Sequence, residues 1–147
     1  MRTTFLALII ALTIADLGAK ALARFALRES DLELTPFFAL RLRFNEGSTF
    51  GFLPMETAGW PVTFFVIIVV CLGWWYARRG GWRTVWPTAL VSAGGIGNLA
   101  DRILRGNVTD YVAIAFGRWQ LPIFNLADVF LVSGVLLLVL LPSKPPI

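Results

Sequence analysis

Residues 123–141 read IFNLADVFLVSGVLLLVLL, an apolar run with a single ionisable residue, Asp128. A helix needs about twenty residues to cross the hydrocarbon of a bilayer, so this run is long enough to span it. Three other runs, at residues 4–25, 60–77 and 84–104, are of comparable length and mostly apolar. The sequence therefore predicts an all-α membrane protein in which four transmembrane helices form a single integral membrane domain over residues 1–147.

The composition agrees with a membrane protein and restricts its chemistry. The chain is 57% hydrophobic, carries a net charge of +4, and has one cysteine and no histidine. Its charges are few and separated by apolar runs, so we expect no nucleic-acid partner. The absence of histidine excludes a Ser-His-Asp triad, a Cys-His dyad and a His-Glu-x-x-His zinc site. We expect no metal and no cofactor, and any catalysis must come from carboxylate, lysine or arginine side chains.

The charged residues between the apolar runs predict the orientation. A short basic turn, residues 78–83, joins the second and third runs, and both Arg2 and Lys144 fall on its side of the membrane. Dense positive charge in a short loop favours the cytoplasm, so we expect both termini there, although the longer loops opposite carry more arginines in total. In an alternative interpretation, residues 1–23 are a cleaved signal peptide. Asp16 and Lys20 interrupt its apolar core and favour a retained span.

The longest segment outside the runs, residues 28–59, contains a strand pattern. Residues 40–44, LRLRF, alternate apolar and basic side chains, which predicts a strand with one apolar and one wet face. Residues 45–47 are typical of a turn, and residues 48–53 would form a returning strand or bulged segment. We therefore expect a small sheet on the outer surface.

Several ionisable residues lie within the spans, where each costs about 2.5–3.5 kcal/mol unless it has a partner or a function. Asp16 and Lys20 stand four residues apart and share a helix face. They either neutralise each other so that the first span can insert, or brace a polar site. Asn98, Asp101 and Arg102 also share a face and are expected to form one hydrogen-bonded network.

Two carboxyl groups, those of Asp110 and Asp128, are expected at the outer entrances of adjacent helix ends. Asp110 follows Asp101 by nine residues, about 180° away on an unbroken helix, so residues 106–107 must break the helix for both acids to face the bundle. Asn125 shares a face with Asp128. One such acid could simply be satisfied by Asn or Arg, but two acids sharing a proton are the arrangement of an aspartic protease.

Four blocks of the sequence resemble lipoprotein signal peptidase, also called signal peptidase II. The blocks are DLGAK (16–20), FNEGSTFG (44–51), GNLADRILRGNVTDY (97–111) and FNLAD (124–128). They occur in the family's order and span nearly the whole chain. The resemblance implies an aspartyl endopeptidase of the bacterial inner membrane with four helices and an extracytoplasmic β-cradle. Its partners would be membrane lipids and diacylglyceryl-modified prolipoproteins, which it would cleave just before the lipidated cysteine, as a monomer with its active site near the outer leaflet.

The resemblance assigns catalysis to Asp110 and Asp128. It implies that eight other residues stabilise or line the site: Asp16, Lys20, Asn45, Gly47, Asn98, Asp101, Arg102 and Asn125. Thr49 and Tyr111 stand where the family commonly has Ala and Phe. Each adds a hydroxyl group that can tune the fit of substrates or of globomycin, an inhibitor of the family.

Two other functions fit parts of the sequence. A catalytically silent paralogue that binds lipopeptides would keep the fold, although the intact acid pair argues against it. A small transporter would use Asp16, Lys20, Asp101 and Asp128 as a polar track. That track is absent from the cytoplasmic halves of the spans, where valine, isoleucine and leucine predominate.

Overall fold

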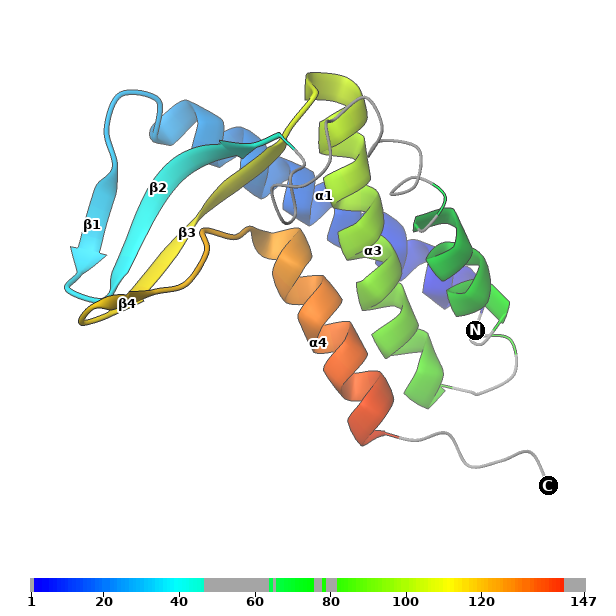
Figure 1. The fold of residues 1–147 in the computed structure, drawn as a ribbon. Helices are drawn as coiled ribbons and strands as arrows, with labels where there is room; N and C mark the ends of the chain where they lie inside the picture. Colours follow the sequence, from blue (N-terminus) through cyan, green and yellow to red (C-terminus); the bar gives the residue numbers. More distant parts are fainter. Residues whose placement is uncertain (1, 47–63, 65, 76–77, 79–81, 142–147) are drawn as a thin grey trace.

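The computed structural model describes residues 2–46, 64, 66–75, 78 and 82–141. Helices cover Arg2–Ala26 (α1), Trp82–Arg105 (α3) and Leu126–Leu140 (α4), with a further helix over Val66–Trp75. Strands cover Leu32–Thr35 (β1), Phe38–Asn45 (β2), Val108–Phe116 (β3) and Trp119–Gln120 (β4). The predicted class, a mostly helical chain with a small sheet, is confirmed. The helices lie together, and the sheet projects from one end of them (Figure 1).

The helices lie where the apolar runs predict them. α1 and α3 match the runs at 4–25 and 84–104 to within two residues, and the described part of the run at 60–77 contains Val66–Trp75. α4 begins at Leu126 rather than at residue 123, because Phe124 exchanges backbone hydrogen bonds with Val112 of β3. Among the described residues, one helix is long and apolar enough to cross a membrane: the stretch Thr3–Ala26 of α1. The four-span arrangement therefore stays a prediction.

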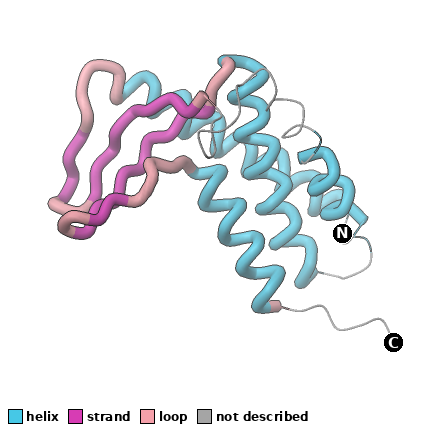
Figure 2. Tube along the Cα trace, viewed as in Figure 1, coloured by secondary structure: helices cyan, strands magenta, loops and turns pink. Residues whose placement is uncertain are grey.

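Glycines let the helices approach closely. A Cβ atom on Gly94 of α3 would meet the carbonyl oxygen of Ala127 on α4, and one on Gly97 would meet the carboxylate of Asp16 on α1. A Cβ on Gly134 of α4 would lie 2.7 Å from a carbonyl oxygen of α3. These contacts join α1, α3 and α4 side by side (Figure 2) and bring their polar residues together.

Replacing Gly97 by Ala is expected to lower the free energy of unfolding by about 1–3 kcal/mol, because the added methyl group overlaps the buried Asp16 carboxylate. Gly18→Ala, in α1, is a matched control, since no atom lies within 4 Å of the added Cβ. The control should equal the wild type or gain up to about 1 kcal/mol from helix propensity. Thermal unfolding in detergent measures both variants, and equal stability would contradict the close contact.

The sheet has four antiparallel strands in the order β1-β2-β3-β4. β2 confirms the strand predicted at residues 40–44, whereas the predicted returning strand at 48–53 lies outside the described residues. The sequence placed the sheet within residues 28–59 alone. That boundary was too narrow, because β3 and β4 come from the segment between α3 and α4. β3 is one of the two central strands, and Asp110 is its third residue.

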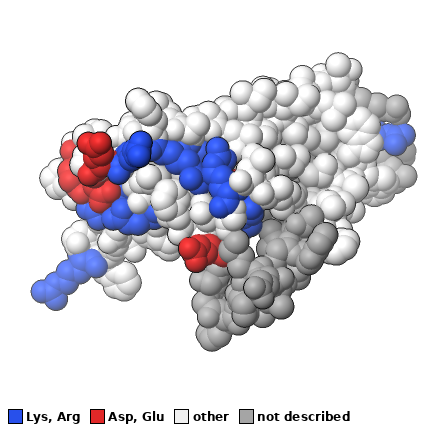
Figure 3. Space-filling model, turned by 90° about the horizontal axis from the view of Figure 1, so that it is seen from above, with Lys and Arg blue, Asp and Glu red and all other residues white. Residues whose placement is uncertain are grey.

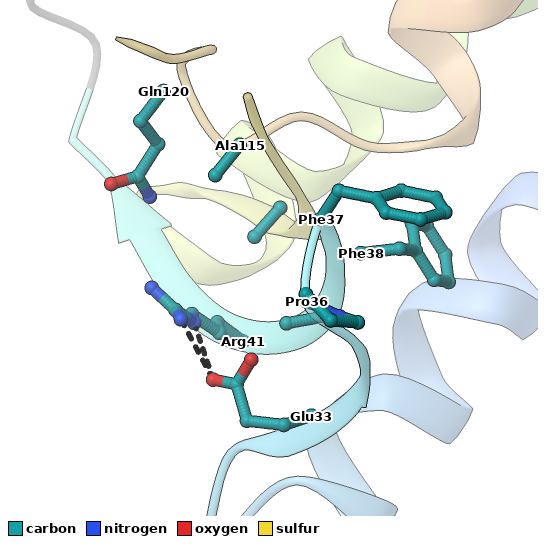
Figure 4. Close-up of a pocket in the computed structure, with 9 residues that line it drawn as sticks. Glu33, Pro36, Phe37, Phe38, Arg41, Ala115 and Gln120 are labelled. Atoms are coloured by element: carbon teal, nitrogen blue, oxygen red, sulfur yellow. Dashed lines mark hydrogen bonds and ion pairs between the residues drawn. The ribbon is translucent and has the colours of Figure 1, made fainter. Parts of the chain in front are cut away.

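The alternation predicted one apolar and one wet face, but at the end of β2 the adjacent side chains of Arg43 and Phe44 are both exposed, so the burial does not follow it. Arg41 Nη2 donates to Glu33 Oε1 at 2.7 Å beside a small pocket, which Phe37, Ala115 and Gln120 also line (Figure 4). None of the residues that line this pocket is a predicted site residue. Seen from above, charged side chains gather at the sheet end of the molecule, while the visible face over the helices is almost uncharged (Figure 3).

Candidate active site

Asp110 reaches the helices because α3 ends just before it. Gly106 adopts a positive φ of 75°, a conformation that glycine tolerates, and its N–H donates to the carbonyl oxygen of Arg102 at 2.8 Å. The predicted break at residues 106–107 is therefore confirmed. The expectation that Asp110 sits at a helix entrance is wrong, because it lies on β3, where only 5% of its surface is exposed.

Asp128 is held by the first turn of α4. Asn125 caps this helix: its Oδ1 accepts from the backbone N–H of Asp128 at 3.0 Å, while Asp128 Oδ2 accepts from the backbone N–H of Asn125 at 3.1 Å. This reciprocal capping box fixes the orientation of the Asp128 carboxylate. The backbone hydrogen bonds of Phe124 to β3 then set the cap beside Asp110.

Two buried amides connect the two acids. Asn125 Nδ2 donates to Asp110 Oδ1 at 2.7 Å and to Asn98 Oδ1 at 3.1 Å. Asn98 Nδ2 donates to Asp128 Oδ1 at 2.8 Å. Both predicted catalytic residues are thus brought into one hydrogen-bonded network, through two of the residues predicted to support them.

A buried ion pair orients this network. Lys20 Nζ donates to Asp16 Oδ2 at 2.7 Å and to Asn98 Oδ1 at 2.8 Å, and neither charged side chain is exposed. Lysine can only donate and an ionised carboxylate can only accept, so Asn98 must turn its oxygen to Lys20 and its amide to Asp128. Asp16 Oδ1 also accepts from the backbone N–H of Ala127 at 2.9 Å, which ties α1 to α4. The Asp16–Lys20 pair therefore contacts the network that joins the two acids, in addition to neutralising its own charges.

The single network expected of three α3 residues does not form; Asn98, Asp101 and Arg102 instead make separate contacts. Asp101 accepts from Arg105 Nη1 at 2.6 Å and from the backbone N–H of Thr109 at 2.7 Å, so it holds the start of β3. Arg102 is half-buried, and the charges of Asp128 and Asp110 act on its guanidinium.

The environment of Asp110 is electrostatically unusual. Burial raises the pKa of its carboxyl group, and the negative charge of Asp128 raises it further, while hydrogen bonds from Asn125 and Asn45 lower it. Asn45, at the end of β2, is thus brought to the site as predicted, whereas Gly47 and Thr49 lie outside the described residues. Burial also raises the pKa of the Tyr111 hydroxyl, which lies close enough to the site to feel the charge of Asp128.

Sequence reasoning missed Arg24 and Thr109. Arg24 Nε donates to Thr109 Oγ1 at 2.7 Å, next to Asp110 in the chain. The signal for Arg24 was its spacing, four residues after Lys20 and eight after Asp16, on one helix face. Thr109 gave no such signal. The described residues contain no group of three or more aspartate, glutamate, cysteine or histidine side chains that could hold a metal ion.

Comparisons of the sequence with known proteins all indicate the same family. The family model described as signal peptidase (SPase) II matches residues 8–142. A lipoprotein signal peptidase of Neisseria meningitidis serogroup C (strain 053442) is 32% identical over 146 residues, 95% of this chain and 88% of that protein. A lipoprotein signal peptidase of Janthinobacterium sp. (strain Marseille) is 37% identical over 72% of this chain and 67% of its own length.

A similar fold occurs in a solved structure described as a bacterial membrane enzyme, determined by the in meso method at 1.9 Å resolution. The two chains superpose with a TM-score of 0.80 over 94% of this chain and 91% of the other. Their sequences are 24% identical, so this likeness concerns the fold alone.

Proposed function

The chain belongs to the signal peptidase II family, and from that membership we propose that it is an intramembrane aspartyl endopeptidase. Its proposed substrates are diacylglyceryl-modified bacterial prolipoproteins, like those that the family processes. Cleavage would remove the signal peptide just before the lipidated cysteine.

The observation that carries the proposal is the pair of Asp110, which is buried, and Asp128, which is partly exposed, bridged by Asn125 and Asn98. A raised pKa suits Asp110 to hold the shared proton. Asp128 would then accept a proton from water as the water oxygen attacks the scissile carbonyl carbon. Asp110 would donate its proton to the carbonyl oxygen. As the C–N bond breaks, the proton taken by Asp128 would pass to the leaving amide nitrogen, and Asp110 would take its proton back as the carbonyl re-forms.

Arg102 is the third member of the proposed site. Its guanidinium lies in the field of both acids, and no hydrogen bond joins it to another described residue. Its donors are thus available to a carbonyl oxygen of the substrate backbone. Asp16, Lys20 and Asp101, all fully buried, would support the site without contacting substrate.

The proposed location is the bacterial cytoplasmic membrane, with four spans, both termini in the cytoplasm and the site near the outer leaflet. Support comes from exposed apolar side chains along the helices, for instance Ile14 at 64% and Val139 at 70% exposure, which would contact lipid. The charged side chains gather at the sheet end, as expected for the end that lies in water (Figure 3). A substrate could then enter laterally from the outer leaflet with its acyl chains still in the membrane.

The test compares one prolipoprotein in two forms, with and without its diacylglyceryl group, after incubation with the purified protein in lipid nanodiscs. We expect cleavage of the lipidated form just before the modified cysteine, read by mass spectrometry. The unmodified form should show a kcat/KM at least ~10-fold lower, because burial of acyl chains contributes to binding. Binding without cleavage would support the silent paralogue, and equal cleavage of both forms would contradict the lipid requirement.

A further inference from the structure

Arg24 reaches from the last turn of α1 to the start of β3. Its Nε donates to Thr109 Oγ1 at 2.7 Å, and its Nη2 donates to Asn107 Oδ1 at 2.9 Å. Its guanidinium carbon also lies 4.7 Å from the centroid of the Phe44 ring, and Phe44 pairs with Thr109 in the sheet. One side chain thus contacts both strands at the position just before Asp110.

Thr109 is held from a second direction by α3. Its backbone N–H donates to Asp101 Oδ2 at 2.7 Å, and the side chain of Thr109 is completely buried. Arg105 Nη1 lies 2.6 Å from Asp101 Oδ1, and Arg24 Nη2 lies 3.9 Å from the same oxygen. The residue that precedes the proposed catalytic acid is therefore fixed through its main chain by Asp101 and through its side chain by Arg24.

We propose that Arg24 is a positioning residue for peptide cleavage, which holds the start of β3 so that the Asp110 carboxyl group faces Asp128. The inference rests on the proposed function. Adjacent residues in a strand point to opposite faces, so a rotation of Thr109 turns Asp110 away from Asn125 and Asp128. A misplacement of about 1 Å at a reacting group can cost ~10²-fold in rate.

The geometry requires arginine rather than any cation. The planar guanidinium serves two acceptors and an aromatic ring at the same time, whereas the compact ammonium of lysine presents a single point charge. The guanidinium is held by these groups at the start of β3 and on β2, and the side chain is 25% exposed. Arg24 therefore acts on catalysis through Thr109, without touching the substrate.

The test measures kcat and KM for Arg24→Met, Arg24→Lys and Thr109→Val, with Arg28→Met as the matched control. Arg28 is exposed and lies one turn further along the chain, beyond the end of α1. We expect Arg24→Met and Arg24→Lys to lower kcat by ~10-fold to ~10²-fold while KM changes less than ~2-fold. Arg28→Met should equal the wild type.

Thr109→Val keeps the shape of the side chain and its N–H bond to Asp101 but removes the hydroxyl, which accepts from Arg24 and also interacts with the Asp101 carboxylate. If Arg24 acts through Thr109, adding Arg24→Met to Thr109→Val should cost little more than either change alone. Additive losses, an unchanged kcat, or a loss confined to KM would overturn the positioning role. Should Arg24→Met not fold, Arg24→Lys decides by the same kcat criterion. A wild-type protein that cleaves nothing would instead contradict the proposed function.

Discussion

Asp110→Asn and Asp128→Asn are each expected to lower the rate of prolipoprotein cleavage by at least ~10²-fold, because each removes one of the two proton-transferring groups. Asparagine keeps the size of the side chain and one acceptor oxygen, so at position 110 the hydrogen bond from Asn125 can be kept. At position 128, where both carboxylate oxygens accept, one of the two hydrogen bonds from Asn98 and the Asn125 backbone is lost. Single-turnover cleavage in nanodiscs measures the chemical step separately from product release.

The control for these variants is Glu29→Gln, which removes an exposed carboxylate outside the network. It should cleave at the wild-type rate. If both Asn variants still cleave at a comparable rate, an aspartyl mechanism through this pair is wrong, even though the chain belongs to the family.

Asp110→Asn should also raise the free energy of unfolding near neutral pH. Burial, with the charge of Asp128, raises the folded-state pKa of Asp110 above its ordinary value of 3.8. The folded protein therefore loses stability as pH rises from about 3.8 through the folded-state pKa, because it must ionise a group that the unfolded chain ionises more easily. Asparagine cannot ionise, so the advantage of the variant should be small in acid and grow through that window. Unfolding midpoints of both proteins over a pH series measure it, and a constant difference would contradict the shift.

The helices could be predicted from the sequence because lipid imposes a simple local rule of length and apolarity. β2 could be predicted because its side chains alternate. β3 could not, since Val108–Phe116 forms a strand by pairing with β2, more than sixty residues away in the chain. Nothing local in VTDYVAIAF distinguishes such a strand from the apolar runs on either side, and the sequence therefore suggested a helix end for Asp110.

The site, too, could be predicted only in the features that local sequence determines. The motifs identified the acid pair, and Asn98 and Asn125 with them, but not which side chain binds which. Asp110 and Asp128 have no cation beside them in the sequence, yet Arg102 acts on both in space. Arg24 and Thr109 are 85 residues apart, and their contact depends on the distance between α1 and β3, which no local pattern records. The close contact of Gly97 on α3 with Asp16 on α1 fixes where α1 lies, and it forms only when the helices pack.

Lys20→Met is expected to lower the free energy of unfolding by about 3–5 kcal/mol, the usual cost of breaking a buried ion pair from one side. The variant leaves the Asp16 carboxylate buried with the backbone N–H of Ala127 as its remaining donor. It also frees the Asn98 oxygen from Lys20, so that Asn98 no longer has to direct its amide to Asp128. Thermal unfolding in detergent and the cleavage rate measure the two effects.

The double variant Asp16→Asn with Lys20→Met separates the two roles of the pair. It removes both buried charges, so it should recover much of the stability that Lys20→Met loses. If the pair serves only to let α1 insert, cleavage should recover together with stability. If Lys20 orients Asn98, and through it Asp128, the double variant should be stable but should cleave ~10-fold or more slowly than the wild type, because Lys20 is absent from both variants. Full recovery of both properties would leave Lys20 with the neutralising role alone.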